Sequence, residues 1–247
     1  MNVLVCIDDT DSLDSRGTGE LAAILAQTVE KNGWGRCGVV TRHQLFVHPD
    51  IPYTSHNSSM CFTADIEQQN LTKVTEYAAS FLESESAEGS DPGLCIAILE
   101  NVPRTDLLVE FGYRAKKTVL SMEDAHKVAE ESGVHLSGHG GTSQGVIGAL
   151  AGVGLRLGGN DGRMRGSLEI PNSQGVASVR EILSHPQVDA VRTLQGVSLN
   201  GDMLVRFVDK VKTVLLGGKL VLLVAADGVG DSGISWKTCT RQQLKAY

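Results

Sequence analysis

Three carboxylates lie close together near the N-terminus, at Asp8, Asp9 and Asp11. They follow the apolar residues 2–7, a run that predicts a buried strand ending at the first of them. Carboxylates gathered in a desolvated site repel one another unless a cation lies among them, and magnesium prefers such hard oxygen ligands. The segment therefore predicts a magnesium site at the end of a strand. A solvated acidic turn is an equally good reading of these residues alone.

Two hydroxyl residues, Thr10 and Ser12, lie within the same acidic segment. We count both among the residues expected to bind a nucleotide, although each could instead bond the local backbone. Thr18 comes shortly afterwards, just before apolar residues at helical spacing. The free N–H groups at the start of a helix attract phosphate oxygens, so Thr18 is a candidate for phosphate contact, or else only a helix N-cap.

A second glycine-rich loop, residues 137–145, precedes another apolar segment that predicts a helix. Its backbone offers the same anion-binding geometry. The loop is not a Walker A sequence, because no Gly-Lys-Ser/Thr follows, and its glycines could instead serve close packing. The residues expected to face phosphate here are Gly138, Gly140, Gly141 and Gly145.

Basic and histidine side chains supply further candidates for phosphate chemistry. Lys116 and Lys117 lie on a predicted helix over residues 105–120, where one of them could neutralise a transferring phosphate or both could simply be solvated. His56 and His139 lie in polar loops and could act as hydrogen-bond donors or proton carriers. Surface histidines are more common than catalytic ones, so the sequence alone leaves both roles open.

The elements around these residues alternate between strand and helix patterns, which predicts an α/β (α+β) fold. A glycine-rich stretch at residues 158–162 is the expected boundary between a domain at 1–157 and a small α+β domain at 158–247. Within the second domain, a Gly-Gly pair between two apolar runs predicts a hairpin at 212–224. Other strands are expected near 39–47, 60–66, 94–99, 189–197 and 203–208, and other helices near 21–29, 68–84, 122–132, 146–151 and 175–184.

Composition narrows the function classes. The 247 residues include 41% hydrophobic residues and five scattered cysteines without a Cys-x-x-Cys pair, which opposes a disulfide framework or a zinc ribbon and favours reduced thiols. A signal peptide and a run of about 18 apolar residues are both missing, so we expect a cytoplasmic protein without a membrane partner.

The charge is unevenly distributed along the chain. Residues 1–159 carry 11 basic and 21 acidic side chains, a charge of −10, whereas residues 160–247 carry 11 and 8, a charge of +3. A polyanion such as RNA would meet the second part more easily.

Several segments, in the same order, resemble the archaeal tRNA(Ile) 2-agmatinylcytidine synthetases. The opening Ile-Asp-Asp-Thr-Asp-Ser matches the start of that family, and the later segments match its Asn-Pro-x-Ile-Pro, Asn-Pro-Gly, Ala-x-Lys-x-Val-Leu and Gly-Leu-Ile-Gly-Ala-Leu-Ala motifs. The likeness spans residues 1–157, about two thirds of the chain. One departure is Ser-His-Asn-Ser-Ser, where the family has Thr-Arg-Gly-Asn-Gly. The matching segments are residues 7–12, 48–53, 91–93, 115–120 and 145–154, and the departing one is 55–59.

The resemblance implies an ATP-dependent kinase domain, which in that family phosphorylates the C2 oxygen of a tRNA cytidine so that agmatine can displace the phosphate. By this likeness the three aspartates hold magnesium and ATP, Thr18 lies near the γ-phosphate, Lys117 contacts phosphate, and Gly145 opens a second phosphate-facing helix. It also implies a ferredoxin-like layout for residues 158–247, in a shortened member without the family's OB fold and zinc ribbon.

Together these observations predict an ATP- and magnesium-dependent phosphoryl-transfer enzyme, kinase- or ligase-like, whose acceptor is a small molecule or an RNA. An aspartyl-phosphate phosphatase is one alternative, because clustered aspartates after a strand can present a carboxylate nucleophile. A non-catalytic nucleotide-binding or RNA-binding accessory protein is another. The oligomeric state is open.

Overall fold

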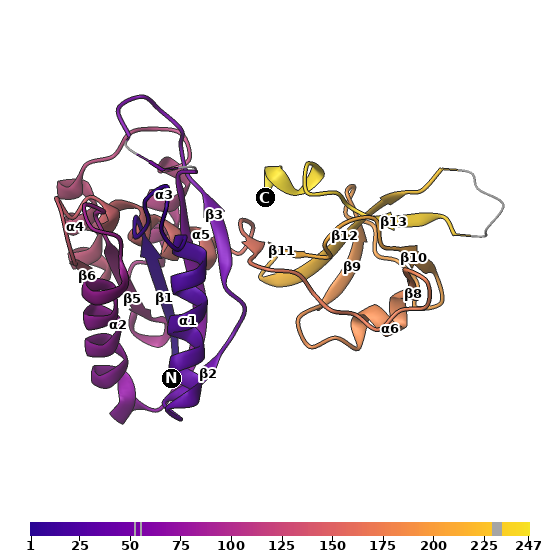
Figure 1. The fold of residues 1–247 in the computed structure, drawn as a ribbon, viewed down its shortest axis with the longest axis horizontal. Coiled ribbons are helices and arrows are strands. Elements are labelled where there is room, and N and C mark those ends of the chain that lie inside the picture. Colours follow the sequence, from indigo (N-terminus) through magenta and orange to yellow (C-terminus); the bar gives the residue numbers. More distant parts are fainter. Residues whose placement is uncertain (52, 55, 229–233) are drawn as a thin grey trace. The chain divides into compact units, whose positions relative to one another are not determined.

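The computed structural model describes residues 1–51, 53–54, 56–228 and 234–247. The chain divides into two compact units, Met1–Gly158 and Gly159–Tyr247, which we call unit 1 and unit 2 (Figure 1). Helices and strands mix throughout, so the expected α/β (α+β) class is confirmed. Two residues of the segments compared above, Pro52 and Ser55, lie outside the described residues. None of the described helices is long and apolar enough to span a membrane.

Unit 1 is built on a sheet with the strand order β6-β5-β1-β4-β3, and a short further strand, β2, also pairs with β4. The central strand β1 is antiparallel to both of its neighbours, with Ile7 opposite Met60 on β4 and Asp8 opposite Gly93 on β5. The site at the end of β1 therefore does not lie at a common carboxyl edge of parallel strands. The strands are β1 (Asn2–Asp8), β2 (Gly35–Cys37), β3 (Thr41–Gln44), β4 (Ser58–Ile66), β5 (Gly93–Ile98) and β6 (His135–Gly138).

Helices cover both faces of this sheet because successive side chains of a strand point to opposite sides. Val3, Val5 and Ile7 of β1 pack in one apolar cluster with α1 and α2. Leu4 and Cys6 pack in another with α3, α4 and α5. The helices are α1 (Thr18–Lys31), α2 (Leu71–Glu85), α3 (Thr105–Arg114), α4 (Met122–Ser132) and α5 (Gly145–Gly158), with short 3₁₀ turns at Gln68–Asn70 and Leu99–Asn101.

Small residues let α5 lie directly against β1. A Cβ added at Gly152 would come within 2.4 Å of Cys6 Sγ, so the helix could not approach as closely with a larger residue. α4 begins at a capping box formed by Ser121 and Asp124. α3 stops at Arg114 and not at residue 120, because the N–H groups of Lys117 and Thr118 both bond to the Arg114 carbonyl in a closing turn.

Unit 2 is mainly β-structure, with the strand order β7-β11-β12-β13-β10-β8 and β9 beside β12. The predicted hairpin is confirmed: β11 and β12 pair across Gly217 and Gly218, whose φ angles of 60° and 72° suit a two-residue turn. A ferredoxin-like unit has two helices, whereas the described residues of unit 2 form one α-helix of five residues. The elements are β7 (Arg163–Met164), β8 (Val176–Ser178), α6 (Val179–Leu183), β9 (Ala190–Thr193), β10 (Leu204–Arg206), β11 (Thr213–Leu216), β12 (Lys219–Ala226), β13 (Trp236–Thr238) and a 3₁₀ turn at Gln243–Ala246.

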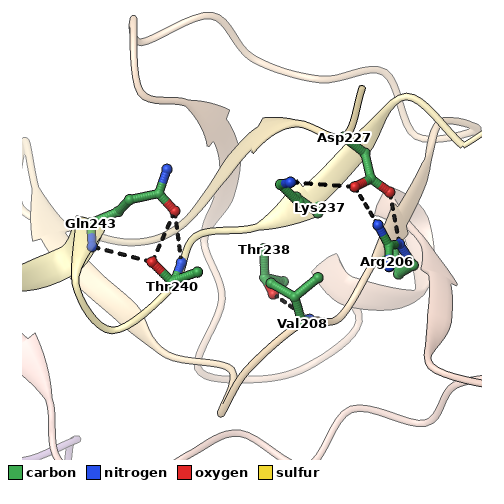
Figure 2. A network of polar contacts seen from close by, with 7 residues as sticks. All are labelled: Arg206, Val208, Asp227, Lys237, Thr238, Thr240 and Gln243. Atoms are coloured by element: carbon green, nitrogen blue, oxygen red, sulfur yellow. Dashed lines mark hydrogen bonds and ion pairs between the residues drawn. The ribbon is translucent and has the colours of Figure 1, made fainter. Parts of the chain in front are cut away.

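Polar side chains tie three strands of unit 2 together (Figure 2). Asp227, just after β12, accepts hydrogen bonds from both Nε and an Nη of Arg206 on β10, the former at 2.7 Å, and lies 3.6 Å from Lys237 Nζ on β13. Thr238 Oγ1 accepts a bond of 3.1 Å from the Val208 backbone N–H. Two of this unit's basic side chains are therefore occupied in holding its own fold.

Candidate active site

The carboxylate of Asp8 lies buried where β1 ends, with only 8% of the residue exposed. Gly148, in the first turn of α5, faces this carboxylate so closely that an added Cβ would lie 1.6 Å from Asp8 Oδ2. The next residue, Asp9, has φ at 52°, a left-handed conformation that turns the chain out of the strand. Sequence and packing together thus fix a carboxyl group between the end of β1 and the start of α5.

The ionised forms of these carboxyl groups are disfavoured. Burial, and then the nearby charges of Asp9 and Asp11, raise the pKa of Asp8 to about 8. Burial, followed by the charges of Asp91 and Asp11, raises the pKa of Asp9 to about 6. A bound cation would offset both the desolvation and the mutual repulsion. The oxygens of Asp8 and Asp9 therefore fit magnesium, which commonly takes one or two protein carboxylates.

A cage of three protein ligands is not formed. In the described part of the chain, no three His, Cys, Asp or Glu side chains are grouped so that they could hold a metal ion. Asp11 instead accepts a hydrogen bond of 2.9 Å from Thr54 Oγ1. Metal binding by the individual aspartates stays a prediction, with Asp11 the weaker candidate of the three.

The start of α1 lies beside the acidic segment at the end of β1. Gly17 is its N-cap, so Thr18 is the first helical residue and not the cap. Glycine has no side chain that could bond the N–H groups at the start of the helix. The Gly17 carbonyl accepts from the N–H groups of Glu20 and Leu21, which leaves those of Thr18 and Gly19 as the helix's leading donors. Thr10 Oγ1 donates a bond of 3.1 Å to Thr18 Oγ1 and ties the acidic segment to the helix.

These groups line a cavity of about 270 Å³ in unit 1. Its wall combines the acidic end of β1, the start of α1, part of β3, the segment before β4, the turn after α3 and the first turn of α5. The lining residues are Asp8, Asp9, Asp11, Gly17, Thr18, Gly19, Arg42, Leu45, Asp50, Ile51, Tyr53, Thr54, His56, Asn57, Ser58, Met60, Ala115, Thr118, Val119, Leu120, Gln144, Gly145, Ile147 and Gly148.

The structure brings six of the fourteen candidate residues named from the sequence to this cavity. Asp8, Asp9, Asp11, Thr18, His56 and Gly145 line it. The other candidates are not among the lining residues: Thr10, Ser12, Lys116, Lys117, Gly138, His139, Gly140 and Gly141. Lys117 is exposed in the turn after α3, although its neighbours Ala115 and Thr118 reach the cavity.

The glycines of the second loop serve packing. A Cβ on Gly138 would meet Ser143 at 2.3 Å, one on Gly140 would meet Pro92 at 3.0 Å, and one on Gly141 would meet Asp91 Oδ1 at 2.0 Å. Asp91 also accepts a short hydrogen bond from the N–H of Thr142. The loop is thus fastened to the segment before β5, where Gly140 and Gly141 make the close contact, and Gly138 leaves space for Ser143 of the loop itself.

Sequence reasoning missed Arg42, which is the only Lys or Arg among the lining residues that the structure describes. It lies on β3, where its Nε donates a bond of 3.0 Å to Ser58 Oγ and an Nη donates one of 3.3 Å to Gln44 Oε1. The signal in the sequence was an arginine inside the strand expected near 39–47, and the structure buries its neighbours Thr41 and His43 completely. Gln144 and Gly148 were also missed, because only the packing of α5 on β1 places them at the cavity.

No protein-family model matches the chain. Two curated relatives are similar to it, and both are the tRNA(Ile) 2-agmatinylcytidine synthetase TiaS of an archaeon. The protein from Methanocorpusculum labreanum is 28% identical over 155 residues, which cover 61% of this chain and 34% of the relative. The protein from Methanosarcina acetivorans is 29% identical over 162 residues, which cover 63% and 36%. The chain therefore spans about a third of the length of the curated relatives that it matches.

Solved structures are similar to the chain as well. A crystal structure of a tRNA fluorescent labeling enzyme is 28% identical, with a TM-score of 0.53 over 62% of this chain and 36% of that one. A complex of TiaS with its isoleucine tRNA and ATP is 24% identical, with a TM-score of 0.57 over 82% and 50%, and at that identity it supports the fold alone. On these comparisons the chain is a partial homologue of the tRNA(Ile) 2-agmatinylcytidine synthetases, similar to them over about 60% of its sequence.

Proposed function

We propose that unit 1 binds ATP with magnesium in the cavity at the end of β1 and transfers a phosphoryl group to an acceptor. The observation that carries the proposal is that the buried Asp8 carboxylate and the open N-terminus of α1 line one cavity. A carboxylate is a ligand that magnesium prefers, and the first N–H groups of a helix bind phosphate oxygens. The cavity therefore offers ligands for both the cation and the triphosphate.

Each part of the cavity has a proposed task. Asp8 and Asp9 would hold magnesium, which supplies charge neutralisation for the phosphates when bound. The N–H groups of Thr18 and Gly19 would bind phosphate oxygens, and Arg42 would compensate the charge that develops on the transferred group. The protein therefore contributes positioning and electrostatics, which are the main demands of phosphoryl transfer.

The relatives suggest the acceptor to test first. Their names describe enzymes that act on an isoleucine tRNA, and one solved relative is described as a complex with that tRNA and ATP. We propose an RNA acceptor, whose oxygen attacks the γ-phosphorus while the bond to the bridging oxygen breaks and ADP leaves. The charge of +3 on residues 160–247, against −10 on residues 1–159, favours contact of RNA with unit 2.

Calorimetry with magnesium and ATP tests the site. Replacing Asp8, Asp9 or Asp11 with Asn should weaken binding, by about 10-fold or more for the first two, because each loses a charged ligand. Asp14→Asn is the matched control, since Asp14 is an exposed carboxylate of the same loop that does not line the cavity. Unchanged affinity and turnover in all three site variants would end the proposal.

A turnover assay separates the proposed reaction from its alternatives. With ATP labelled at the γ-phosphate, transfer of label to tRNA or to a small acceptor, with release of ADP, is the expected result. A stable beryllofluoride adduct on Asp9 without ATP affinity would favour an aspartyl-phosphate phosphatase instead. Tight ATP binding without turnover, across tRNA and a broad panel of small acceptors, would favour an accessory protein.

A further inference from the structure

A second group of reactive side chains lies on β6, apart from the cavity. β6 pairs with β5 at the edge of the unit 1 sheet, and its alternate residues point to opposite faces. Val134 and Leu136 pack into the apolar cluster that includes α3, α4 and α5. His135 and Ser137 share the other face, and His139 follows directly after the strand. None of these three residues lines the cavity described above.

Short distances connect them into a chain of hydrogen bonds with α2. His139 Nδ1 lies 3.3 Å from Oε1 of Glu83, near the end of that helix. His139 Nε2 lies 2.8 Å from Ser137 Oγ, which in turn lies 2.9 Å from His135 Nε2. A serine hydroxyl, an imidazole and a carboxylate therefore stand in the order and with the ring atoms of a nucleophile–base–carboxylate triad.

The chemistry of the partners sets the direction of these bonds. An ionised Glu83 can only accept, so His139 donates to it through Nδ1–H. In the neutral imidazole this leaves His139 Nε2 unprotonated, so that it accepts the hydrogen bond of the Ser137 hydroxyl. His135 donates through Nε2–H to the same Ser137 oxygen, and burial together with the neighbouring His139 lowers the pKa of His135, which favours its neutral form. Ser137 thus has its proton directed at a base and a donor at its oxygen.

The base is held firmly. Only 8% of the His139 side chain is exposed, while the Glu83 side chain is 62% exposed. The His139 backbone N–H donates a bond of 2.8 Å to the Pro92 carbonyl, which anchors the residue to the segment before β5. Ser137 itself is half-buried, so its oxygen is not enclosed in the core. A fixed base beside a partly accessible hydroxyl is the arrangement that makes serine nucleophilic.

We propose that Ser137, His139 and Glu83 form a second reactive site, independent of the nucleotide cavity, which hydrolyses small, activated carboxylic esters. Ser137 and His139 are its catalytic residues and Glu83 is a positioning residue. The phosphoryl-transfer proposal neither requires this activity nor explains it.

The proposed reaction has two steps. Ser137 Oγ forms a bond to the acyl carbon as its proton passes to His139 Nε2, and the departing alkoxide takes that proton as the C–O bond of the ester breaks. Water then attacks the acyl-serine, giving a proton to Nε2, and Ser137 recovers it as the acid is released. His135 Nε2 lies 2.9 Å from Ser137 Oγ, and we assign its N–H to the negative charge that develops on the acyl oxygen.

Labelling of the full chain with an alkyl fluorophosphonate probe tests the proposal directly. Attack by Ser137 forms an Oγ–P bond and releases fluoride, and peptide mass spectrometry then locates the adduct. We expect labelling of wild-type protein at Ser137, together with hydrolysis of p-nitrophenyl acetate. Both should fall at least about 100-fold in Ser137→Ala and in His139→Gln, the loss typical when a nucleophile or general base is removed.

Controls separate chemistry from folding. Ser143→Ala removes a hydroxyl of the adjoining loop, which donates to the Gly140 carbonyl, and should leave labelling unchanged. Glu83→Gln should lower the labelling rate, and Glu83→Asp should recover part of it, which a purely structural role would not produce. Asp8→Asn should label like the wild type, so failure of this site and failure of the nucleotide site are distinguishable. Absence of a Ser137 adduct on folded wild-type protein would overturn the inference.

Discussion

The loops before α1 and α5 in unit 1 differ in whether they bond the backbone N–H groups at the start of the helix. At the start of α1, Thr18 and Gly19 line the cavity, and as the first residues of the helix they have N–H groups without an intrahelical acceptor. Before α5, the N–H of Gly145 bonds to the Asp91 carbonyl at 2.9 Å, and the next two N–H groups bond to carbonyls of the loop itself. A glycine-rich loop before a helix is thus not sufficient for phosphate binding, because the loop's own contacts can consume the donors.

α5 nevertheless contributes to the site, through its small residues. Gly148 leaves the space that Asp8 occupies, and Gly145 approaches the segment before β5 so closely that an added Cβ would lie 2.3 Å from the Asp91 carbonyl oxygen. The difference between the two helices is therefore one of role: α1 supplies donors, and α5 supplies room for a carboxylate. The four predictions below test this division.

The largest effect is expected at Gly148. In Gly148→Ala the new Cβ would overlap Asp8 Oδ2, so the carboxylate must move, and affinity for magnesium and ATP should fall about 100-fold, at the upper end of losses seen when a ligand's support is removed. Calorimetry measures this. Gly152→Ala, one turn later, meets Cys6 Sγ at 2.4 Å and should lower stability by about 1–3 kcal/mol without changing affinity more than about threefold. Equal affinity losses in both variants would contradict the role given to Gly148.

The second-largest effect on ATP binding is expected at Arg42, and a much smaller one at Lys117. Arg42→Ala removes the cation that lines the cavity, so ATP affinity or turnover should fall about 10–30-fold, in line with a charge-assisted hydrogen bond. Arg42→Lys should recover only part of it, since a lysine cannot reproduce the bidentate geometry. Lys117→Ala should change either quantity by less than about threefold. A larger loss in Lys117→Ala than in Arg42→Ala would restore the lysine to the role that its sequence resemblance implied.

Asp8 should make unit 1 less stable as the pH rises. Its folded pKa of about 8 lies above the ordinary value of 3.8, so the folded protein keeps a proton that the unfolded chain releases. Stability should therefore decline between about pH 4 and pH 8 and level off above. Asp8→Asn removes this dependence and should raise the melting temperature at pH 8 by about 2–4 °C or more, equivalent to at least about 1 kcal/mol. The gain should be much smaller at pH 4, and an equal gain at both pH values would refute the explanation.

The smallest effect on affinity is expected in the second loop. Gly141 has φ at 48° and its added Cβ would meet Asp91, so Gly141→Ala should destabilise the protein by about 1 kcal/mol or more. ATP affinity should stay within about twofold, because Gly141 does not line the cavity. Gly17→Ala, where the nearest atom is 3.6 Å away and φ is −71°, should be tolerated by the fold and is the matched comparison. A strong affinity loss in Gly141→Ala would return the loop to the site.

The sequence by itself was sufficient for the elements with strong local signals. The apolar run before Asp8, the helix at 122–132 and the Gly217-Gly218 hairpin each depend on neighbours in the chain, and each formed as expected. The acidic residues at the end of β1 and Thr18 at the start of α1 reached one cavity for the same reason: a short loop joins them.

Only the tertiary structure decided which distant residues joined that cavity and which did not. Arg42 and Gly148 reach the same cavity as the acidic segment because β3 pairs with β4 and α5 packs against β1. Gly140 and Gly141 do not line the cavity, because they pack against Pro92 and Asp91 in the segment before β5. The Ser137–His139–Glu83 array likewise needs a strand and a helix more than fifty residues apart. Local patterns encode backbone conformation, whereas contacts between separate elements depend on shape and register that a single linear pattern does not carry.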